Sequence, residues 1–290
     1  MMKKIVGFGE ALWDVFPEGR KIGGAPANFA YHVAQWGLDS CAVSAIGNDD
    51  SGDDIVKEFD ENGLEYCLER VDFPTGVVKV TLDENKVPSY NIMEGVAWDN
   101  IPMTPELEAL AKDCRAVCFG SLAQRSAVSR ATINSFIDMM PEDALKIFDI
   151  NLRQHYFTEE IICGSMDKAD ILKINDEEIL VVSEMLNIAS KSEKEICQVL
   201  LERFSLKMVI LTCGDKGSYV LTNEESSWLD TPQVNVVSTV GAGDSFTGTF
   251  IASLLLGKTI RQAHEAAVRV SAYVCTCQGA MPMVPQHLKM

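Results

Sequence analysis

Short apolar runs rich in β-branched residues alternate along this chain with longer stretches of helical periodicity, and this alternation restricts the fold more than any other feature of the sequence. Each run ends in turn residues, as expected of strands buried on both faces of a parallel sheet. The predicted strands are 5–8, 42–46, 116–119, 145–148, 171–174 and 208–212. Strands that alternate with helices predict an α/β protein with helices on both faces of its sheet.

The helical stretches carry start and stop signals. Thr104 stands before a proline, the arrangement of an N-cap and a first helical residue. Ser190 and Glu193 have the spacing of a capping box. Gly37 and Gly257 follow two apolar stripes at positions where glycine commonly ends a helix. These signals support the helices that the alternation requires.

One region, from 75 to 92, has strand-like residues without an intervening helix. Residues 77–82 and 87–92 are typical of two strands around a turn at 83–86, which predicts a β-hairpin. A hairpin inserted into an α/β chain is a candidate lid over a ligand site. From the pattern alone, an additional hairpin at the edge of the sheet fits equally well.

Length and charge limit the organisation of the chain and its partners. With 290 residues, 47% of them apolar, the chain fits one domain over 1–290 with at most a small insert. Its 25 basic and 42 acidic side chains give a formal charge of 25 − 42 = −17. This excess argues against nucleic acid or membrane partners, because cationic side chains bind both kinds of surface. A small phosphate ligand in a local pocket remains compatible with it.

The cysteines and the N-terminus predict a cytoplasmic protein with reduced thiols. Nine cysteines, an odd number, are scattered along the chain, unlike a disulfide framework. Neither Cys114 with Cys118 nor Cys275 with Cys277 has the partners of a zinc site. Acidic residues interrupt the first apolar run before a secretory core can form, and no stretch approaches the roughly 18 apolar residues of a membrane helix.

Two glycine-rich segments offer chemistry, and the first is 23–28. Its two glycines let the backbone approach a ligand closely. Asn28 then stands near a helix start, with a donor and an acceptor that suit a sugar hydroxyl. A plain glycine turn before a helix would have the same residue types.

The second segment, 239–246, leads into an amphipathic helix. Successive N–H groups and the positive end of the helix dipole form an anion site there. Asp244 at that place can take a proton from a hydroxyl beside a bound phosphate. A helix cap is the simpler interpretation of the same residue. The chain has no Walker A stretch, so it is not a P-loop enzyme.

With both segments in this order, the chain resembles the ribokinase-like, pfkB-type carbohydrate kinases over nearly its whole length. The first signature is 23–28 with the helix that ends at Gly37, and the second is 241–244. The resemblance implies a three-layer α/β/α fold with a mostly parallel central sheet and a small β-strand lid formed by about 10–22 and 74–98. Relatives pair through their lids, so a homodimer through this surface remains open.

The resemblance also implies roles for individual residues. The sugar-binding residues correspond to Asp14, Gly23, Gly24 and Asn28. The catalytic base corresponds to Asp244, and the anion hole for the transferred phosphoryl group corresponds to the backbone amides of Gly241, Ala242 and Gly243.

On the nucleotide side, Asn175 and Glu178 match the family motif Asn-x-x-Glu, which organises Mg²⁺ and the nucleotide phosphates. In this comparison Glu178 acts on the metal indirectly. The motif follows the predicted strand 171–174, at the strand end where α/β proteins bind ligands. An acidic helix start would have the same residue types. The nucleotide-contacting turn of the family is similar to Thr212, Gly214 and Gly217.

The segments 119–122 and 148–153 are similar to those of bacterial fructokinases. In that group an arginine at the position of Arg153 lies near the sugar or the transferred phosphate.

Two departures accompany this similarity. Many members carry an aspartate where Ser238 stands, and that aspartate helps to hold an activating potassium ion, so Ser238 argues against K⁺ activation. Segment 90–98 lacks the arginine that fructokinases often carry after their lid strands, which weakens the fructose assignment and leaves the kinase assignment intact.

The sequence therefore predicts a phosphotransferase that uses ATP and Mg²⁺ to phosphorylate a primary hydroxyl of a sugar, with fructose favoured. Kinases of ribose, 2-keto-3-deoxygluconate or a nucleoside are alternatives on the same fold. A phosphorylated sugar fits less well, because no cluster of basic residues accompanies the sugar motifs. A non-catalytic regulator that binds a sugar or a nucleotide is the alternative from another class, and the intact Asp244 with its glycine loop argues against it.

Overall fold

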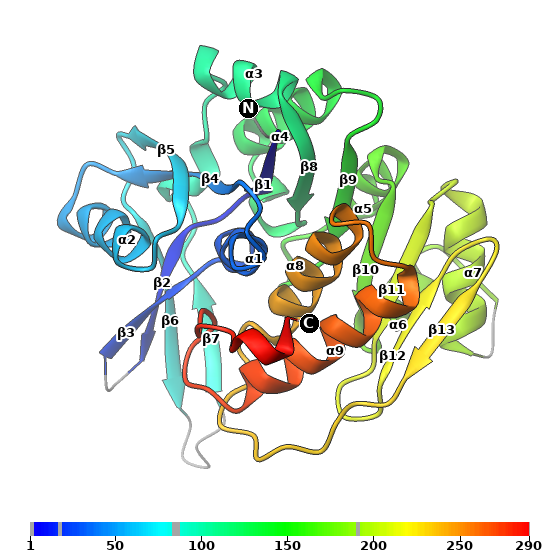
Figure 1. Ribbon diagram of the computed structural model, residues 1–290. Coiled ribbons are helices and arrows are strands. Elements are labelled where there is room, and N and C mark those ends of the chain that lie inside the picture. Colours follow the sequence, from blue (N-terminus) through cyan, green and yellow to red (C-terminus); the bar gives the residue numbers. More distant parts are fainter. Residues whose placement is uncertain (1–2, 17–18, 83–87, 190–191, 290) are drawn as a thin grey trace.

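Two sheets of different size organise the chain (Figure 1). The computed structural model describes residues 3–16, 19–82, 88–189 and 192–289. The main sheet has the strand order β13-β12-β11-β10-β9-β8-β1-β4-β5 and the small sheet the order β3-β2-β6-β7. The strands of the main sheet are β1 (Lys4–Phe8), β4 (Ser40–Gly47), β5 (Glu65–Val71), β8 (Cys114–Phe119), β9 (Leu145–Asp149), β10 (Ile171–Asn175), β11 (Met208–Thr212), β12 (Ser218–Leu221) and β13 (Ser226–Leu229). The strands of the small sheet are β2 (Leu12–Phe16), β3 (Gly19–Gly23), β6 (Gly76–Leu82) and β7 (Pro88–Ile92).

The main sheet is parallel from β5 to β11, and β12 and β13 extend it antiparallel. All six strands predicted from apolar runs are present in it, which confirms the mostly parallel α/β fold. Three further strands, β5, β12 and β13, escaped prediction. Strand β5 is an edge strand that is only partly buried, and its charged residues break the continuous apolar pattern. Ser218 and Ser226 similarly give β12 and β13 a mixed composition.

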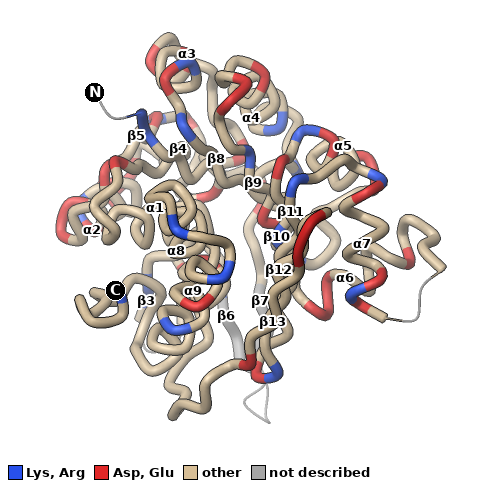
Figure 2. The backbone as a smooth tube through the Cα atoms, turned by 45° about the vertical axis from the view of Figure 1, so that its right-hand side comes forward, with Lys and Arg blue, Asp and Glu red and all other residues tan. Residues whose placement is uncertain are grey.

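Helices cover both faces of the main sheet. The helices are α1 (Ala25–Ala34), α2 (Asp50–Glu61), α3 (Pro105–Lys112), α4 (Ala127–Met139), α5 (Glu159–Lys168), α6 (Glu178–Met185), α7 (Glu193–Arg203), α8 (Ala242–Leu255) and α9 (Ile260–Cys275), with short 3-10 turns at η1 (Ala97–Asn100), η2 (Leu122–Arg125) and η3 (Gln286–Leu288). Helices α1, α2, α8 and α9 pack on one face, and α3 to α7 on the other. The expected three-layer α/β/α arrangement is therefore confirmed. Figure 2 shows acidic and basic residues interspersed along the outer helices.

Local signals at the helix ends were partly right. Thr104 caps α3 by accepting a hydrogen bond from the N–H of Leu107, as predicted. The predicted start of α7 at Ser190 is wrong, because the cap is Ser192, whose side chain accepts from the N–H of Glu195. Ser190 itself lies outside the described residues.

The small sheet contains the predicted hairpin. Strands β6 and β7 pair antiparallel at the expected place, and the predicted turn at 83–86 lies outside the described residues. Strand β2 leaves the main sheet directly after β1, pairs parallel with β6 and is followed by its antiparallel partner β3. The hairpin is thus part of a four-stranded sheet that stands off the end of the main sheet (Figure 1).

Strand β6 is anchored at its root by the loop between β4 and α2. The carboxylate of Asp49 accepts hydrogen bonds from the N–H of Thr75 at 2.9 Å, the hydroxyl of Thr75 at 2.6 Å and the N–H of Gly52 at 2.8 Å. Burial acts to raise the pKa of Asp49, but these hydrogen bonds lower it below its ordinary value. One side chain therefore caps α2 and holds the start of the small sheet.

Other expectations concern thiols, metals and membranes. Each of the nine cysteines lies in the described part of the chain and is a free thiol, as predicted. Among the described residues, no group of three or more His, Cys, Asp or Glu side chains is arranged to hold a metal ion. No helix within those same residues combines the length and the apolar character that crossing a membrane requires.

Asp49→Ala removes the acceptor of three hydrogen bonds and is expected to lower the free energy of unfolding by about 1–2 kcal/mol at neutral pH. Asp50→Ala makes the same change of charge at the exposed neighbouring residue and should cost less than about 0.5 kcal/mol. Because the folded-state pKa of Asp49 is depressed, its contribution should be lost as the pH falls below about 4. Urea titrations of both variants measure the difference, and equal midpoints would contradict the anchoring role.

Candidate active site

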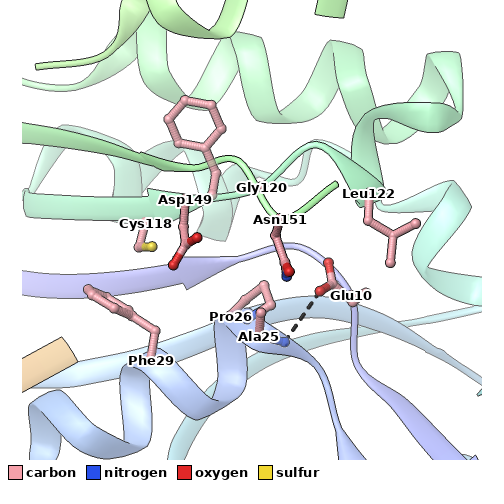
Figure 3. A pocket seen from close by; sticks show the side chains of 10 residues that line it. Glu10, Ala25, Pro26, Phe29, Cys118, Gly120, Leu122, Asp149 and Asn151 are labelled. Carbon is pink, nitrogen blue, oxygen red and sulfur yellow. Dashed lines mark hydrogen bonds between the residues drawn. The ribbon is translucent and has the colours of Figure 1, made fainter. Parts of the chain in front are cut away.

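The carboxyl ends of the central parallel strands meet beside the small sheet and the start of α1. Glu10 follows β1, Gly120 follows β8, and Asp149 and Asn151 lie at the end of β9. Figure 3 shows the side chains of Glu10, Asp149 and Asn151 and the backbone at Gly120 around one cavity, with Pro26 of α1 on its other wall. Open α/β sheets bind ligands at this edge. None of the predicted site residues lines this cavity itself, but Gly24 and Asn28 are next in sequence to Ala25 and Phe29 of its wall.

The two glycine-rich signatures touch each other in this region. The side-chain amide of Asn28 on α1 donates a 2.7 Å hydrogen bond to the carboxylate of Asp244 on α8. The two residues are 216 positions apart in sequence. Helices α1 and α8 therefore bring the first signature, 23–28, and the second signature, 241–244, into direct contact.

Gly23 and Gly24 are required by close approaches at the start of α1. A side chain on Gly24 would lie 2.3 Å from the backbone oxygen of Glu10, and its φ of +119° disfavours any other residue. A side chain on Gly23 would lie 2.5 Å from the carboxylate of Asp14. Asp14 on β2 therefore lies against Gly23, which places two of the predicted sugar-binding residues side by side.

Helix α8 begins at Gly241, which has a φ of +78° and no side chain to cap the helix. Ala242 and Gly243 form its first turn, where backbone donors lack partners within the helix. The N–H of Ala242 donates to the backbone oxygen of Thr239 at 3.2 Å, in the loop before the helix. The ammonium group of Lys173 lies 3.0 Å from the place that a side chain on Gly243 would occupy. A buried cation therefore stands directly beside the loop that the sequence predicted to bind an anion.

Lys173 belongs to a buried polar cluster that the sequence analysis missed. It forms a 3.1 Å ion pair with Asp149, and the hydroxyl of Thr247 donates to the same carboxylate at 3.0 Å. Lys173 and Asp149 are only 7% and 6% exposed. The available signal was a single lysine inside the otherwise apolar strand β10, since a lysine is rarely buried without a charged partner.

The charges around Lys173 join the predicted catalytic and nucleotide residues. Burial acts to lower the pKa of Lys173, but the carboxylates of Asp149, Glu178 and Asp244 together raise it above its ordinary value. Lys173 is therefore a permanent cation between these three side chains.

Three carboxyl groups in the cleft have raised pKa values. Burial raises the pKa of Asp244 to about 6, with a further rise from Asp149. Burial also raises the pKa of Asp14 to about 6 and that of Glu10 to about 7. The positive charge of Arg153 acts against the rise at Asp14, Glu10 and Asp244. Strongly perturbed carboxyl groups that share a cleft are characteristic of active sites.

Glu10 is a second residue that sequence reasoning did not assign. Its carboxylate accepts a 3.3 Å hydrogen bond from the N–H of Ala25, at the start of α1 (Figure 3). An isolated glutamate after a strand gave no sequence signal that it would turn back to this helix.

Arg153 lies on the exposed loop after β9. Its guanidinium group donates to the backbone oxygen of Leu152 at 2.9 Å. Asn151 and Gln154 in this loop have φ values of 46° and 49°, which are uncommon for residues other than glycine. The positive charge of Arg153 acts to lower the pKa values of Glu10, Asp14 and Asp244 in the cleft.

The predicted motif Asn175 to Glu178 closes a tight turn at the end of β10. The Asn175 side chain accepts hydrogen bonds from the N–H groups of Glu177 and Glu178. The Glu178 carboxylate accepts from the N–H of Asn175 at 3.0 Å and from that of Leu152 at 2.9 Å. Glu178 therefore connects this turn to the loop of Arg153, and backbone groups occupy both of its oxygens.

Thr212, Gly214 and Gly217 lie one strand further along the same edge of the sheet. The backbone oxygen of Thr212 accepts from the N–H of Asp176, which joins the two turns. The backbone oxygen of Gly214 accepts from the hydroxyl of Thr231 at 2.7 Å. A side chain on Gly217 would collide with Trp228 of β13. The glycine is therefore also needed for β13 to pack beside this turn.

An apolar surface lies on the loop that follows Thr231. Val236, Val237 and Val240 are 61%, 56% and 48% exposed. The loop is fixed to the end of α9 by hydrogen bonds from the N–H groups of Val237 and Ser238 to the oxygen of Cys275. Exposed valines are therefore presented between Thr231, whose hydroxyl is bonded to Gly214, and the start of α8.

Comparisons with known proteins agree with this geometry. Residues 6–287 match the model of the pfkB family carbohydrate kinases. An ATP-dependent 6-phosphofructokinase of Thermoanaerobacterium thermosaccharolyticum is 30% identical over 91% of this chain and 82% of its own length. Fructokinase-2 of Solanum lycopersicum is 27% identical over 97% and 93%. The crystal structure of a fructokinase from Xylella fastidiosa with bound ATP superposes with a TM-score of 0.84 at 23% identity, over 98% of this chain and 96% of that one. The chain therefore belongs to the pfkB family of carbohydrate kinases.

Proposed function

We propose that this chain is a fructokinase, which transfers the γ-phosphate of ATP to a primary hydroxyl of fructose with Asp244 as the base. The observation that carries the proposal is the contact between Asn28 and Asp244, because it sets a sugar-type donor directly beside a buried carboxylate at a helix start. The sugar would lie between Asp14, Gly24 and Asn28, with its reacting hydroxyl toward Asp244.

In the proposed reaction, Asp244 takes the proton of the hydroxyl as its oxygen attacks the γ-phosphorus. A new O–P bond forms, the bond from that phosphorus to the bridging oxygen breaks, and ADP leaves. A pKa of about 6 keeps Asp244 ionised at neutral pH while leaving it a stronger base than an exposed aspartate. Since phosphoryl transfer has a loose transition state, placement of the two oxygens matters more than basicity.

The transferred phosphoryl group would be met by the N–H groups of Ala242 and Gly243, together with that of Gly241. Donors fixed by the fold stabilise developing charge without reorganising during the reaction. Lys173 adds a buried positive charge on the protein side of this loop. We assign Arg153 to the open side of the cleft, where its forked donors suit a phosphoryl oxygen.

The nucleotide would be contacted by Asn175, Glu178, Thr212, Gly214 and Gly217. Its base would face the exposed valines after Thr231. Mg²⁺ fits this site as an ion carried by the phosphates, because no carboxylate cage exists among the described residues and backbone N–H groups occupy both oxygens of Glu178. When bound, the ion neutralises phosphate charge. Glu178 then acts indirectly, by shaping the turn.

We assign residues 1–290 to one kinase domain whose small sheet, about 10–22 and 74–98, forms the lid. Strand β2 carries Asp14 into the cleft, so the lid contributes to sugar binding as well as covering it. Exclusion of water by the lid would limit hydrolysis of ATP.

Fructose is favoured as the acceptor by the plant and bacterial fructokinases among the relatives. One relative is a 6-phosphofructokinase, so fructose 6-phosphate is the competing acceptor. Near Asp14, Arg20 of β3 is already paired with Asp54, whereas Arg153 and Lys21, the strand partner of Asp14, are the cations that a second phosphate could meet. The comparison of the two sugars therefore needs the assay below.

A coupled assay of ADP release with Mg-ATP should give the highest kcat/KM with fructose. The panel includes fructose 6-phosphate, ribose, 2-keto-3-deoxygluconate and a nucleoside. Highest activity on another acceptor would replace fructose and keep the kinase assignment. Turnover with none of them would overturn the kinase proposal and favour a binding regulator.

Asp244→Asn is expected to lower kcat by at least about 10²-fold, because the amide cannot take the proton. In the wild type, kcat/KM should fall as the pH drops below about 6, where Asp244 becomes protonated. The ionised carboxylate is disfavoured by burial, so the variant should unfold at the same or a higher temperature than the wild type at pH 8. Thermal melts exclude misfolding as the cause, and retention of wild-type kcat would remove Asp244 from the mechanism.

Turnover is expected not to depend on K⁺. The hydroxyl of Ser238 accepts a hydrogen bond from the N–H of Val240 at 3.3 Å, and it offers no negative charge to a cation. Rates in tetramethylammonium chloride and in KCl should therefore agree. Ser238→Asp supplies the missing carboxylate and should introduce stimulation by K⁺. Strong stimulation of the wild type would contradict this expectation.

A further inference from the structure

The C-terminal strap, defined here as residues 278–289, lies against both signature helices (Figure 1). Ala280 packs on Gly241 so closely that a side chain on Gly241 would come within 2.5 Å of the Ala280 methyl group. Gly241 begins α8 and the proposed anion loop. The strap therefore forms the surface against which that loop rests.

The strap is attached to α1 through His32, a residue to which the proposed mechanism gives no role. His32 is 1% exposed, and its Nε2 lies 2.8 Å from the backbone oxygen of Ala280. A carbonyl oxygen only accepts, so Nε2 carries the proton and donates it. Burial lowers the pKa of His32 to about 4, so the ring stays neutral at physiological pH. Its Nδ1 has no hydrogen-bond partner among the described residues.

Gln35, one turn further along α1, holds the next part of the strap. Its amide donates to the oxygen of Pro282 at 3.2 Å and accepts from the N–H of Val284 at 2.6 Å. Lys289 then donates to the backbone oxygen of Gln35 at 2.8 Å. The strap is thus bonded to α1 and its C-cap at several points. Of these contacts, only that of His32 is made to Ala280, the residue that touches Gly241.

We propose that His32 is a positioning residue for phosphoryl transfer, which holds Ala280 against Gly241 and so keeps the N–H groups of the anion loop aimed at the transferred phosphate. The same helix carries Asn28, one turn before His32. Helix α1 would therefore position the acceptor hydroxyl through Asn28 and the phosphate-binding loop through the strap. The inference rests on the proposed function, because it takes the loop at Gly241 as the phosphate site.

His32→Leu removes the donor and should lower kcat by about 10- to 100-fold at saturating sugar and ATP, since small displacements of an aligned site have effects of this size. The KM for the sugar should not change, because Asn28 and Asp14 remain in place. His32→Gln keeps an N–H donor of similar reach and should restore most of the lost turnover. Wild-type kcat in His32→Leu, or no rescue by glutamine, would overturn the proposal.

His264 offers a matched control. It is also fully buried, burial also lowers its pKa to about 4, and it bridges Ser218 and Ser227 away from the strap. His264→Leu should reduce thermal stability to a similar degree while kcat stays at the wild-type value. Parallel losses of kcat in both leucine variants would show a general effect of destabilisation and overturn the specific role of His32.

Hydrogen–deuterium exchange provides a readout that does not need turnover. Exchange of the amides in 238–243 should accelerate in His32→Leu and stay unchanged in His264→Leu, whose ring contacts α8 only further along, at Phe246. If no sugar supports turnover in the wild type, the proposed function fails, and this comparison still decides whether His32 holds the loop. If His32→Leu does not fold, His32→Phe, which keeps an aromatic ring and removes the donor, should produce the same acceleration, and unchanged exchange there would overturn the proposal.

Discussion

The buried ammonium group of Lys173 is the interaction on which this site depends. Three carboxylates, Asp149, Glu178 and Asp244, raise its pKa, and each comes from a different segment of the chain. Without the cation, these side chains would carry uncompensated negative charge into a region from which water is largely excluded, and buried charges of that kind are costly. The ion pair with Asp149 thus lets the ends of β9, β10 and α8 converge within one cleft.

This arrangement also reconciles a strongly acidic chain with phosphate chemistry. The formal charge of −17 argues against binding long polyanions, because such partners are held by cationic surfaces. A single phosphoryl group requires fewer positive charges than a long polyanion does. Backbone N–H groups at the start of α8, one buried lysine and one arginine on an exposed loop place positive potential where the group would lie. The surface can then remain acidic, which favours solubility.

The sequence predicted those parts of the molecule that local rules control. Continuous apolar runs identified the parallel strands, and the glycine signatures identified the two helix starts that meet at Asn28 and Asp244. Contacts between distant segments had no local signal. Glu10 reaches the N–H of Ala25, and Lys173 pairs with Asp149, only because the fold joins separate strand ends. The cap of α7 was misplaced for a related reason, since serine stands at both 190 and 192 and spacing alone did not distinguish them.

The helix starts differ in whether the side chain of the N-cap residue accepts a backbone N–H, and at α4 and α6 it does not. Five helices begin at a residue whose side chain accepts a backbone N–H, namely Asp49, Thr104, Thr158, Ser192 and Thr259. The two signature helices begin at Gly24 and Gly241, which have no side chain to do so. At α1 the first donor turns to Glu10, whereas at α8 a side chain at the cap would strike Ala280. Glycine there is compatible with both proposals: it puts no side-chain acceptor on the N–H groups at the helix start, and it leaves room for Ala280 of the strap. A side chain that capped α8 at Gly241 would therefore collide with Ala280 and place an acceptor on the N–H groups that we propose for the phosphate.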